Sequence, residues 1–179
     1  MLTCPSSLPP SRRWWCALVL PLAALLLIAC HGRRTYHHFE PVDPTSWTVA
    51  DTVRFRPETI DEDRLYTLSV GVRFADSYAY RDLWIVVEQR AGRRQSAPLT
   101  PYGDKPRRPA LTPVRRDTLH MILADSKGKW LAQGVAMHEA EEVITAARLS
   151  KDYDTEFLLY HIMRQQTIQG ICEVGLKIK

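Results

Sequence analysis

The chain has 179 residues, with 24 Lys and Arg against 20 Asp and Glu, 45% hydrophobic residues and four cysteines. This length suits one domain and is short for two, and the composition excludes a disordered tail or a collagen-like rod. The formal net charge of +4 is too small and too scattered along the chain to indicate a nucleic-acid partner.

The first thirty residues have the pattern of an export signal. Arg12 and Arg13 form a positively charged start, and the next 16 residues are uncharged and apolar. A membrane span needs about 20 apolar residues, so this stretch better suits a secretory signal. It ends in LIAC at residues 27–30, which resembles the bacterial lipobox, whose cysteine thiol accepts a diacylglycerol. We therefore predict a lipoprotein signal peptide over 1–29 and lipidation of Cys30. The alternatives are a plain signal peptide, or a short membrane anchor with an accidental cysteine.

Removal of the signal peptide would change the charge and the cysteine content. It would leave 150 residues with a formal charge of +2, because residues 1–29 hold two arginines and no acid. Cys4 and Cys16 would be lost, so acylation of Cys30 would leave Cys172 without a disulfide partner in the monomer. We expect Cys172 to be a small buried hydrophobic residue. Acyl chains would anchor the protein to a membrane without spanning it.

Residues 30–45 are polar and contain Pro41 and Pro44, which predicts a lipid-anchored tether. Tyr36 and Phe39 are expected to pack where this tether joins the folded domain.

The clearest strand pattern lies in residues 65–74, where apolar side chains alternate with Thr, Ser, Gly and Arg. This two-residue period is typical of a half-buried antiparallel strand. Further strands are predicted at 52–55, 83–88, 117–123, 156–162 and 173–178, with a turn at 125–128. Turn signals recur about every ten residues, as in a sandwich or barrel. We predict an all-β fold over 46–179, an antiparallel β-sandwich that is jelly-roll-like.

Residues 91–116 differ from the rest of the chain because they combine five prolines and seven basic residues with a single acid, Asp104. Proline cannot join a central strand ladder, so we predict a long basic loop between two strands. A solvated insertion is the simpler interpretation. The functional alternative is an electrostatic contact with an acidic partner, with Arg107, Arg108, Arg115 and Arg116 as the candidate contact residues.

Residues 139–149 are ambiguous. The sequence EAEEVITAARL contains good helix formers and favours a helix when taken alone, whereas the all-β context favours a strand through 143–149.

The sequence offers no strong catalytic or metal-binding motif. The histidines lack helical metal-site spacing and cysteine partners at zinc-ligand spacing, and no nucleophile elbow, phosphate-binding loop or C-x-x-C is present. The acidic run at 61–63 lacks the spacing of a calcium loop, and 125–128 is more simply a hairpin turn. We therefore expect no enzyme activity, no cofactor, no metal and no small-molecule substrate.

Several aromatic residues outside the signal suggest a second function, namely Trp47, Tyr78, Tyr80, Trp84 and Trp130. Trp84 lies within an apolar run and is expected in the core. If Trp47, Tyr78, Tyr80 or Trp130 lined an exposed groove, the domain could stack sugars and bind peptidoglycan or lipopolysaccharide.

A series of short segments stands in a characteristic order along the chain. They are Trp47, 51–55 (DTVRF), 68–73 (LSVGVR), 78–84 (YAYRDLW), 117–119 (DTL), 123–131 (LADSKGKWL), 163–164 (MR), 170–171 (GI) and 174–178 (VGLKI). The ordered set spans residues 36–178 and resembles the GldH family of gliding-motility lipoproteins of the Bacteroidota. The chain departs from the family pattern in its long basic loop, at Gln133-Gly134 and at His161-Ile162.

The resemblance implies a non-catalytic lipoprotein of the outer membrane that faces the periplasm. It implies a role in gliding motility and the associated type IX secretion machinery, exerted by binding other motility or secretion lipoproteins. Surface-exported lipoproteins of this phylum resemble a pattern with acidic residues after the lipidated cysteine. Residues 31–34 are instead HGRR, which favours retention on the periplasmic side. Because a lipid tether raises local concentration, a weak contact would suffice for binding.

Overall fold

A computed structural model describes residues 36–94, except 59 and 61, and residues 110–179. Within these ranges the chain forms ten strands and no helix. The strands are β1 (Tyr36–Pro41), β2 (Trp47–Thr48), β3 (Val53–Phe55), β4 (Arg64–Ala75), β5 (Asp82–Arg93), β6 (Thr112–Ile122), β7 (Met137–Leu149), β8 (Tyr153–His161), β9 (Thr167–Ile168) and β10 (Ile171–Ile178).

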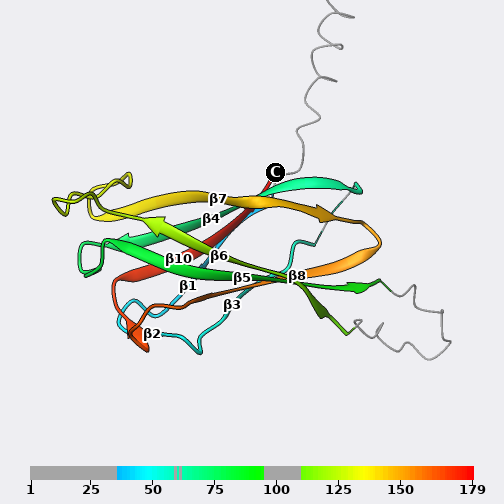
Figure 1. Ribbon diagram of the computed structural model, residues 1–179, viewed down its shortest axis with the longest axis horizontal. Coiled ribbons are helices and arrows are strands. Elements are labelled where there is room, and N and C mark those ends of the chain that lie inside the picture. Colours follow the sequence, from blue (N-terminus) through cyan, green and yellow to red (C-terminus); the bar gives the residue numbers. More distant parts are fainter. Residues whose placement is uncertain (1–35, 59, 61, 95–109) are drawn as a thin grey trace, which may run out of the picture. The chain divides into compact units, whose positions relative to one another are not determined.

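The strands form two four-stranded antiparallel sheets, and a small pair of β2 with β9 (Figure 1). The first sheet has the order β1-β10-β4-β7 and the second has the order β3-β8-β5-β6. If the two-residue strands β2 and β9 are set aside, the eight remaining strands can be numbered 1 to 8 along the chain. The first sheet then has the order 1-8-3-6, and the second sheet has the order 2-7-4-5. This is the arrangement of a jelly roll. The prediction of an all-β antiparallel sandwich with jelly-roll character is therefore confirmed.

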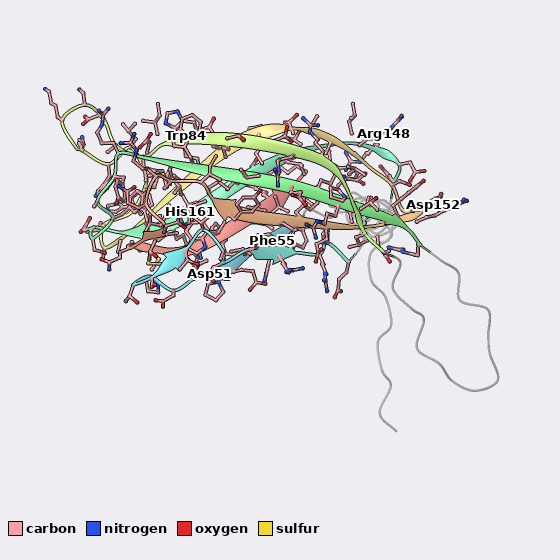
Figure 2. All side chains as sticks on the ribbon, turned by 60° about the horizontal axis from the view of Figure 1, so that its bottom comes forward. Asp51, Phe55, Trp84, Arg148, Asp152 and His161 are labelled. Atoms are coloured by element: carbon pink, nitrogen blue, oxygen red, sulfur yellow. The ribbon has the colours of Figure 1, made fainter. Side chains whose placement is uncertain are left out.

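One hydrophobic core lies between the inner faces of the two sheets. In β4, the alternate residues from Tyr66 to Phe74 are all buried, as their two-residue period predicted. They pack in one cluster with inward-facing residues of the second sheet, including Ile85 of β5 and Phe157 of β8. Figure 2 shows Phe55 and His161 directed into this interior. The six strands predicted from the sequence are all present, and β5, β6 and β8 extend beyond the predicted bounds.

The folded domain begins earlier than predicted, since β1 lies within the expected tether 30–45. It pairs along its whole length with β10, from Tyr36 opposite Ile178 to Pro41 opposite Glu173. The reason is visible at Phe39, whose ring lies over Gly71 and Gly175. The Arg73 guanidinium lies 4.0 Å from the centre of the same ring. Of the expected tether, residues 30–35 precede the described part of the chain.

Residues 139–149 form a strand, so the helix favoured by their composition is wrong. They belong to β7, which pairs with β4 from Met137 opposite Ala75 to Leu149 opposite Arg64. A register shift at Leu68 and Ser69 of β4 accommodates an extra residue in β7. Ala147 and Leu149 are buried in the sandwich core. Tertiary pairing has overridden local helix propensity here, as it commonly does.

The predicted loop 91–116 is shorter than expected at both ends. β5 continues to Arg93, and β6 begins at Thr112 and includes Pro113. Pro113 is tolerated because β6 is an edge strand, and its pairing with Arg90 follows a register shift. The remainder of the predicted loop, 95–109, lies outside the described residues.

Candidate binding surfaces

The four arginines predicted as a contact do not act as one loop cluster. Arg107 and Arg108 lie outside the described residues, whereas Arg115 and Arg116 are neighbours in β6 and therefore point to opposite faces. Arg115 donates hydrogen bonds of 2.9 Å to the Ala146 carbonyl and to Thr145 Oγ1 of β7. Because β6 and β7 are edge strands of different sheets, Arg115 ties the two sheets together along one side of the sandwich.

Arg116 lies on the outer face of the second sheet, where it binds a buried carboxylate. Glu88 of β5 is only 6% exposed. Its two carboxylate oxygens contact Arg90 at 2.6 Å and Arg116 at 3.0 Å. The hydrogen bond from Arg90, followed by that from Arg116, lowers the pKa of Glu88 from its ordinary value.

A second buried glutamate on the same face repeats this arrangement. Glu156 of β8 contacts Arg56 at 2.6 Å and Arg54 at 3.7 Å. The face therefore presents half-exposed guanidinium groups to solvent above buried carboxylates. The roles of Arg54 and Arg56 are not visible in the local sequence, because their partner Glu156 is about one hundred residues away in the chain. The alternation of Val53, Arg54 and Phe55 indicated only that Arg54 faces outward.

Trp84 lies at the surface, so its predicted place in the core is wrong (Figure 2). Its side chain is on the outer face of the second sheet because the inward positions of β5 are Leu83, Ile85 and Val87. The indole stacks on the His120 ring with centroids 4.0 Å apart. Asp82 Oδ2 lies 3.2 Å from Trp84 Nε1 and 2.7 Å from His120 Nε2. This cluster borders a cavity of about 430 Å³ that Tyr80 and His120 line.

The aromatic residues expected to line a sugar-binding groove have different environments. Trp47 and Tyr78 are buried in the core and cannot stack on a ligand. Tyr80 and Trp130 are half-buried and pack against the core. Trp130 also donates a hydrogen bond of 3.2 Å to Asp76 Oδ1.

His161 is a fully buried titratable group in the core beside Trp47. Its Nε2 lies 3.2 Å from the Trp47 carbonyl oxygen, and its Nδ1 accepts from the Met163 amide. The two rings meet edge to face with centroids 4.9 Å apart. Burial lowers the pKa of His161 below its ordinary 6.5. The neutral imidazole is therefore the form that the core holds.

We predict that acid weakens the fold through His161. Below pH about 6.5 the unfolded chain takes up a proton that the folded chain resists, so the free energy of unfolding decreases as the pH decreases. The slope from this residue is at most about 1.4 kcal/mol per pH unit, between pH 6.5 and the lowered folded-state pKa. Urea unfolding at pH 7.5 and 5.5 measures it. His161→Gln keeps a donor without titrating and should lose this part of the slope. An unchanged slope in the variant contradicts the assignment.

A groove lies along the side of the sandwich where the edge strands β6 and β7 approach each other. Its cavity of about 710 Å³ is lined by apolar residues that include Ile122, Leu131 and Met137. The β7 side contributes Glu139, Glu141 and Glu142, and no lysine or arginine is among the described residues that line the groove. The groove thus combines apolar and acidic side chains in its lining.

Two further sequence expectations, the turn at 125–128 and the burial of Cys172, have outcomes in the described residues. The turn at 125–128 is confirmed, with Gly128 at φ 82° and Asp125 Oδ1 accepting from the Lys127 and Lys129 amides. Cys172 is half-buried, not fully buried as predicted. No group of three or more His, Cys, Asp or Glu in the described segments is placed to hold a metal. These segments also contain no helix long and apolar enough to cross a membrane.

Comparison with known proteins gives a family. The family model described as GldH lipoprotein matches residues 34–100 and 107–178. The chain is 22% identical over 164 residues to a gliding motility lipoprotein GldH homolog of Christiangramia forsetii, covering 87% of this chain and 89% of that protein. It is 29% identical over 69 residues to the gliding motility lipoprotein GldH of Flavobacterium johnsoniae, covering 38% and 43% of the two chains. Since the family model matches most of the chain, this protein belongs to the GldH lipoprotein family.

Proposed function

We propose that this protein is a non-catalytic, lipid-anchored component of the outer membrane that faces the periplasm. It supports gliding motility and the associated type IX secretion machinery by binding partner lipoproteins. The observation that carries the proposal is membership of a lipoprotein family across both halves of the chain. The LIAC sequence at 27–30 supplies the cysteine for the anchor, and the basic residues after Cys30 favour the periplasmic side.

The fold supports a binding role. The sandwich interior is filled by one apolar cluster, and the charged and apolar features described above lie on its surface. Anchoring at Cys30 would confine the domain to the membrane surface, where effective concentrations reach the millimolar range. A modest surface contact would then hold a partner.

The anchor is tested first, by labelling cells with radioactive palmitate. We expect incorporation into the wild type and into Cys172→Ala, and none into Cys30→Ala, because only the lipobox cysteine is acylated. Label retained in Cys30→Ala would show that the lipid is elsewhere.

Partner binding is tested by a mild-detergent pull-down of the tagged, acylated protein, read by mass spectrometry. Recovery of motility or secretion lipoproteins, at least tenfold reduced for Cys30→Ala, is the expected result because the tether supplies the local concentration. Recovery of peptidoglycan or lipopolysaccharide without a protein partner would instead support the second candidate, a carbohydrate-binding domain. That candidate rests on the exposed Trp84 and the adjacent cavity lined by Tyr80 and His120.

A further inference from the structure

The free edge of β7 is the surface best suited to hold a protein segment. β7 is the last strand of the first sheet, so the backbone groups on its other side have no strand partner among the described residues. Edge strands of this kind accept an additional strand through main-chain hydrogen bonds. They also require protection against indiscriminate pairing. The contacts along this edge show that it can accept a backbone partner and that part of it is already protected.

One end of the edge is already paired by the chain itself. The Gln133 amide donates to the Glu139 carbonyl at 3.1 Å, and the Glu139 amide donates to the Gln133 carbonyl at 2.7 Å. This short antiparallel bridge shows that the edge geometry accepts a backbone partner. It also fixes the direction of the backbone groups in β7, because the amide and the carbonyl of Glu139 both point away from β4.

The alternation of a strand then places the backbone groups of Glu141 and Val143 on the same outward side. The extra residue of β7 follows, between Val143 and Thr145. Beyond it, the outward carbonyl of Ala146 is occupied by Arg115. Among the described residues, a short stretch of edge without a backbone partner therefore lies between Gln133 at one end and Arg115 at the other.

Side chains around this open edge indicate the chemistry of its occupant. Three exposed apolar side chains line the groove beside it, Ile122, Leu131 and Met137, and Val143 is exposed on β7 itself. The acidic side chains are Glu139, Glu141 and Glu142. Glu139 and Glu141 have cationic partners, Arg73 and Lys177, whereas Glu142 makes no ion pair with any described residue. An acidic, apolar edge fits an extended segment in which basic and apolar residues alternate.

We propose that a short extended segment of a partner protein, rich in alternating basic and apolar residues, pairs with β7 at Glu141–Val143. Its basic side chains face the groove side, where Glu142 lies opposite Val70 and makes no ion pair with a described residue. Its apolar side chains lie on the other face, beside the exposed Val143. A second copy of this chain is a poor occupant, because two β7 edges would place their glutamates against one another. The inference rests on the proposed binding function and names the surface that performs it.

The test uses the full acylated chain in detergent micelles and three fluorescent heptapeptides. One alternates Lys and Val, one alternates Glu and Val, and one is the Lys–Val peptide with a central proline. Fluorescence anisotropy should show the Lys–Val peptide binding at least tenfold more tightly than the other two. Hydrogen exchange should slow at the Glu141 and Val143 amides when that peptide is bound. Equal binding of the three peptides, or unchanged exchange, overturns the proposal.

Two pairs of variants separate backbone pairing from charge. Val143→Pro removes an outward N–H that β4 does not use, so the fold should persist, as its melting temperature will show, while peptide affinity falls at least tenfold. Val143→Thr keeps the N–H and should bind within about threefold of wild type. Glu142→Lys should weaken binding several-fold more than Glu142→Gln. Equal effects within either pair overturn the corresponding part of the proposal.

The outcomes also separate this inference from the proposed function. If the pull-down recovers motility lipoproteins from Val143→Pro as well as from the wild type, partner binding stands and the β7 edge is excluded. A β7-mediated dimer, seen as mass doubling that Val143→Pro abolishes, would make a second copy the occupant and overturn the proposal.

Discussion

Replacing Trp47 by alanine should lower the free energy of unfolding by about 3–5 kcal/mol, as expected when a fully buried aromatic side chain is truncated. The side chain is 1% exposed and meets the His161 ring edge to face. Its Nε1 donates to the Asp51 carbonyl at 3.0 Å. The variant therefore loses apolar burial, leaves a cavity, and leaves the Asp51 carbonyl without this donor. Urea unfolding of the mature chain carrying Cys30→Ala measures the difference.

Trp84→Ala is the matched control, because it removes the same side chain from a surface position. Trp84 is 38% exposed, and its loss should cost about 1 kcal/mol, mainly through the stack with His120. If the two variants were equally unstable, the assignment of one tryptophan to the core and the other to the surface would be contradicted.

Gly170→Ala should be the second strongly destabilising substitution, with a loss of about 3 kcal/mol or more. Gly170 has φ 89°, where a side chain costs about 1–2 kcal/mol. A Cβ there would also lie 2.5 Å from the Tyr78 amide nitrogen, which is a backbone atom that cannot turn aside. The Gly170 carbonyl accepts from the Ala75 amide, and its amide donates to the Pro44 carbonyl, both at 2.8 Å. Movement to relieve the clash would strain both bonds.

Gly128→Ala separates the cost of the positive φ from the cost of the steric clash with Tyr78. Gly128 has a similar φ of 82°, but a Cβ at that position would meet nothing within 4 Å. Its substitution should cost only the backbone strain, about 1–2 kcal/mol. Thermal or urea unfolding of both variants gives the comparison, and a Gly170→Ala variant no less stable than Gly128→Ala would refute the close approach to Tyr78.

The local sequence pattern was sufficient to place side chains in the core where one face of a strand is buried. The alternation in 65–74 placed five side chains in the core correctly, and the Asp125–Gly128 turn follows from local chemistry alone. The same alternation carried no information about the opposite face. Glu88 and Glu156 are buried there with arginines from other strands against them, Arg116 of β6 and Arg54 of β3 respectively. Such pairs depend on which strands become neighbours, and strand order is not visible in a local period.

The sequence by itself therefore determined the strand-rich fold, most of the strand positions and the resemblance to one lipoprotein family. Tertiary structure alone decided that 139–149 is a strand, that β1 joins the first sheet, and that Trp84 faces outward. In each case the local preference is weak, and pairing with a distant strand contributes more to the free energy. The open edge of β7 is likewise a product of topology, because a strand is an edge only through the absence of a neighbour on one side.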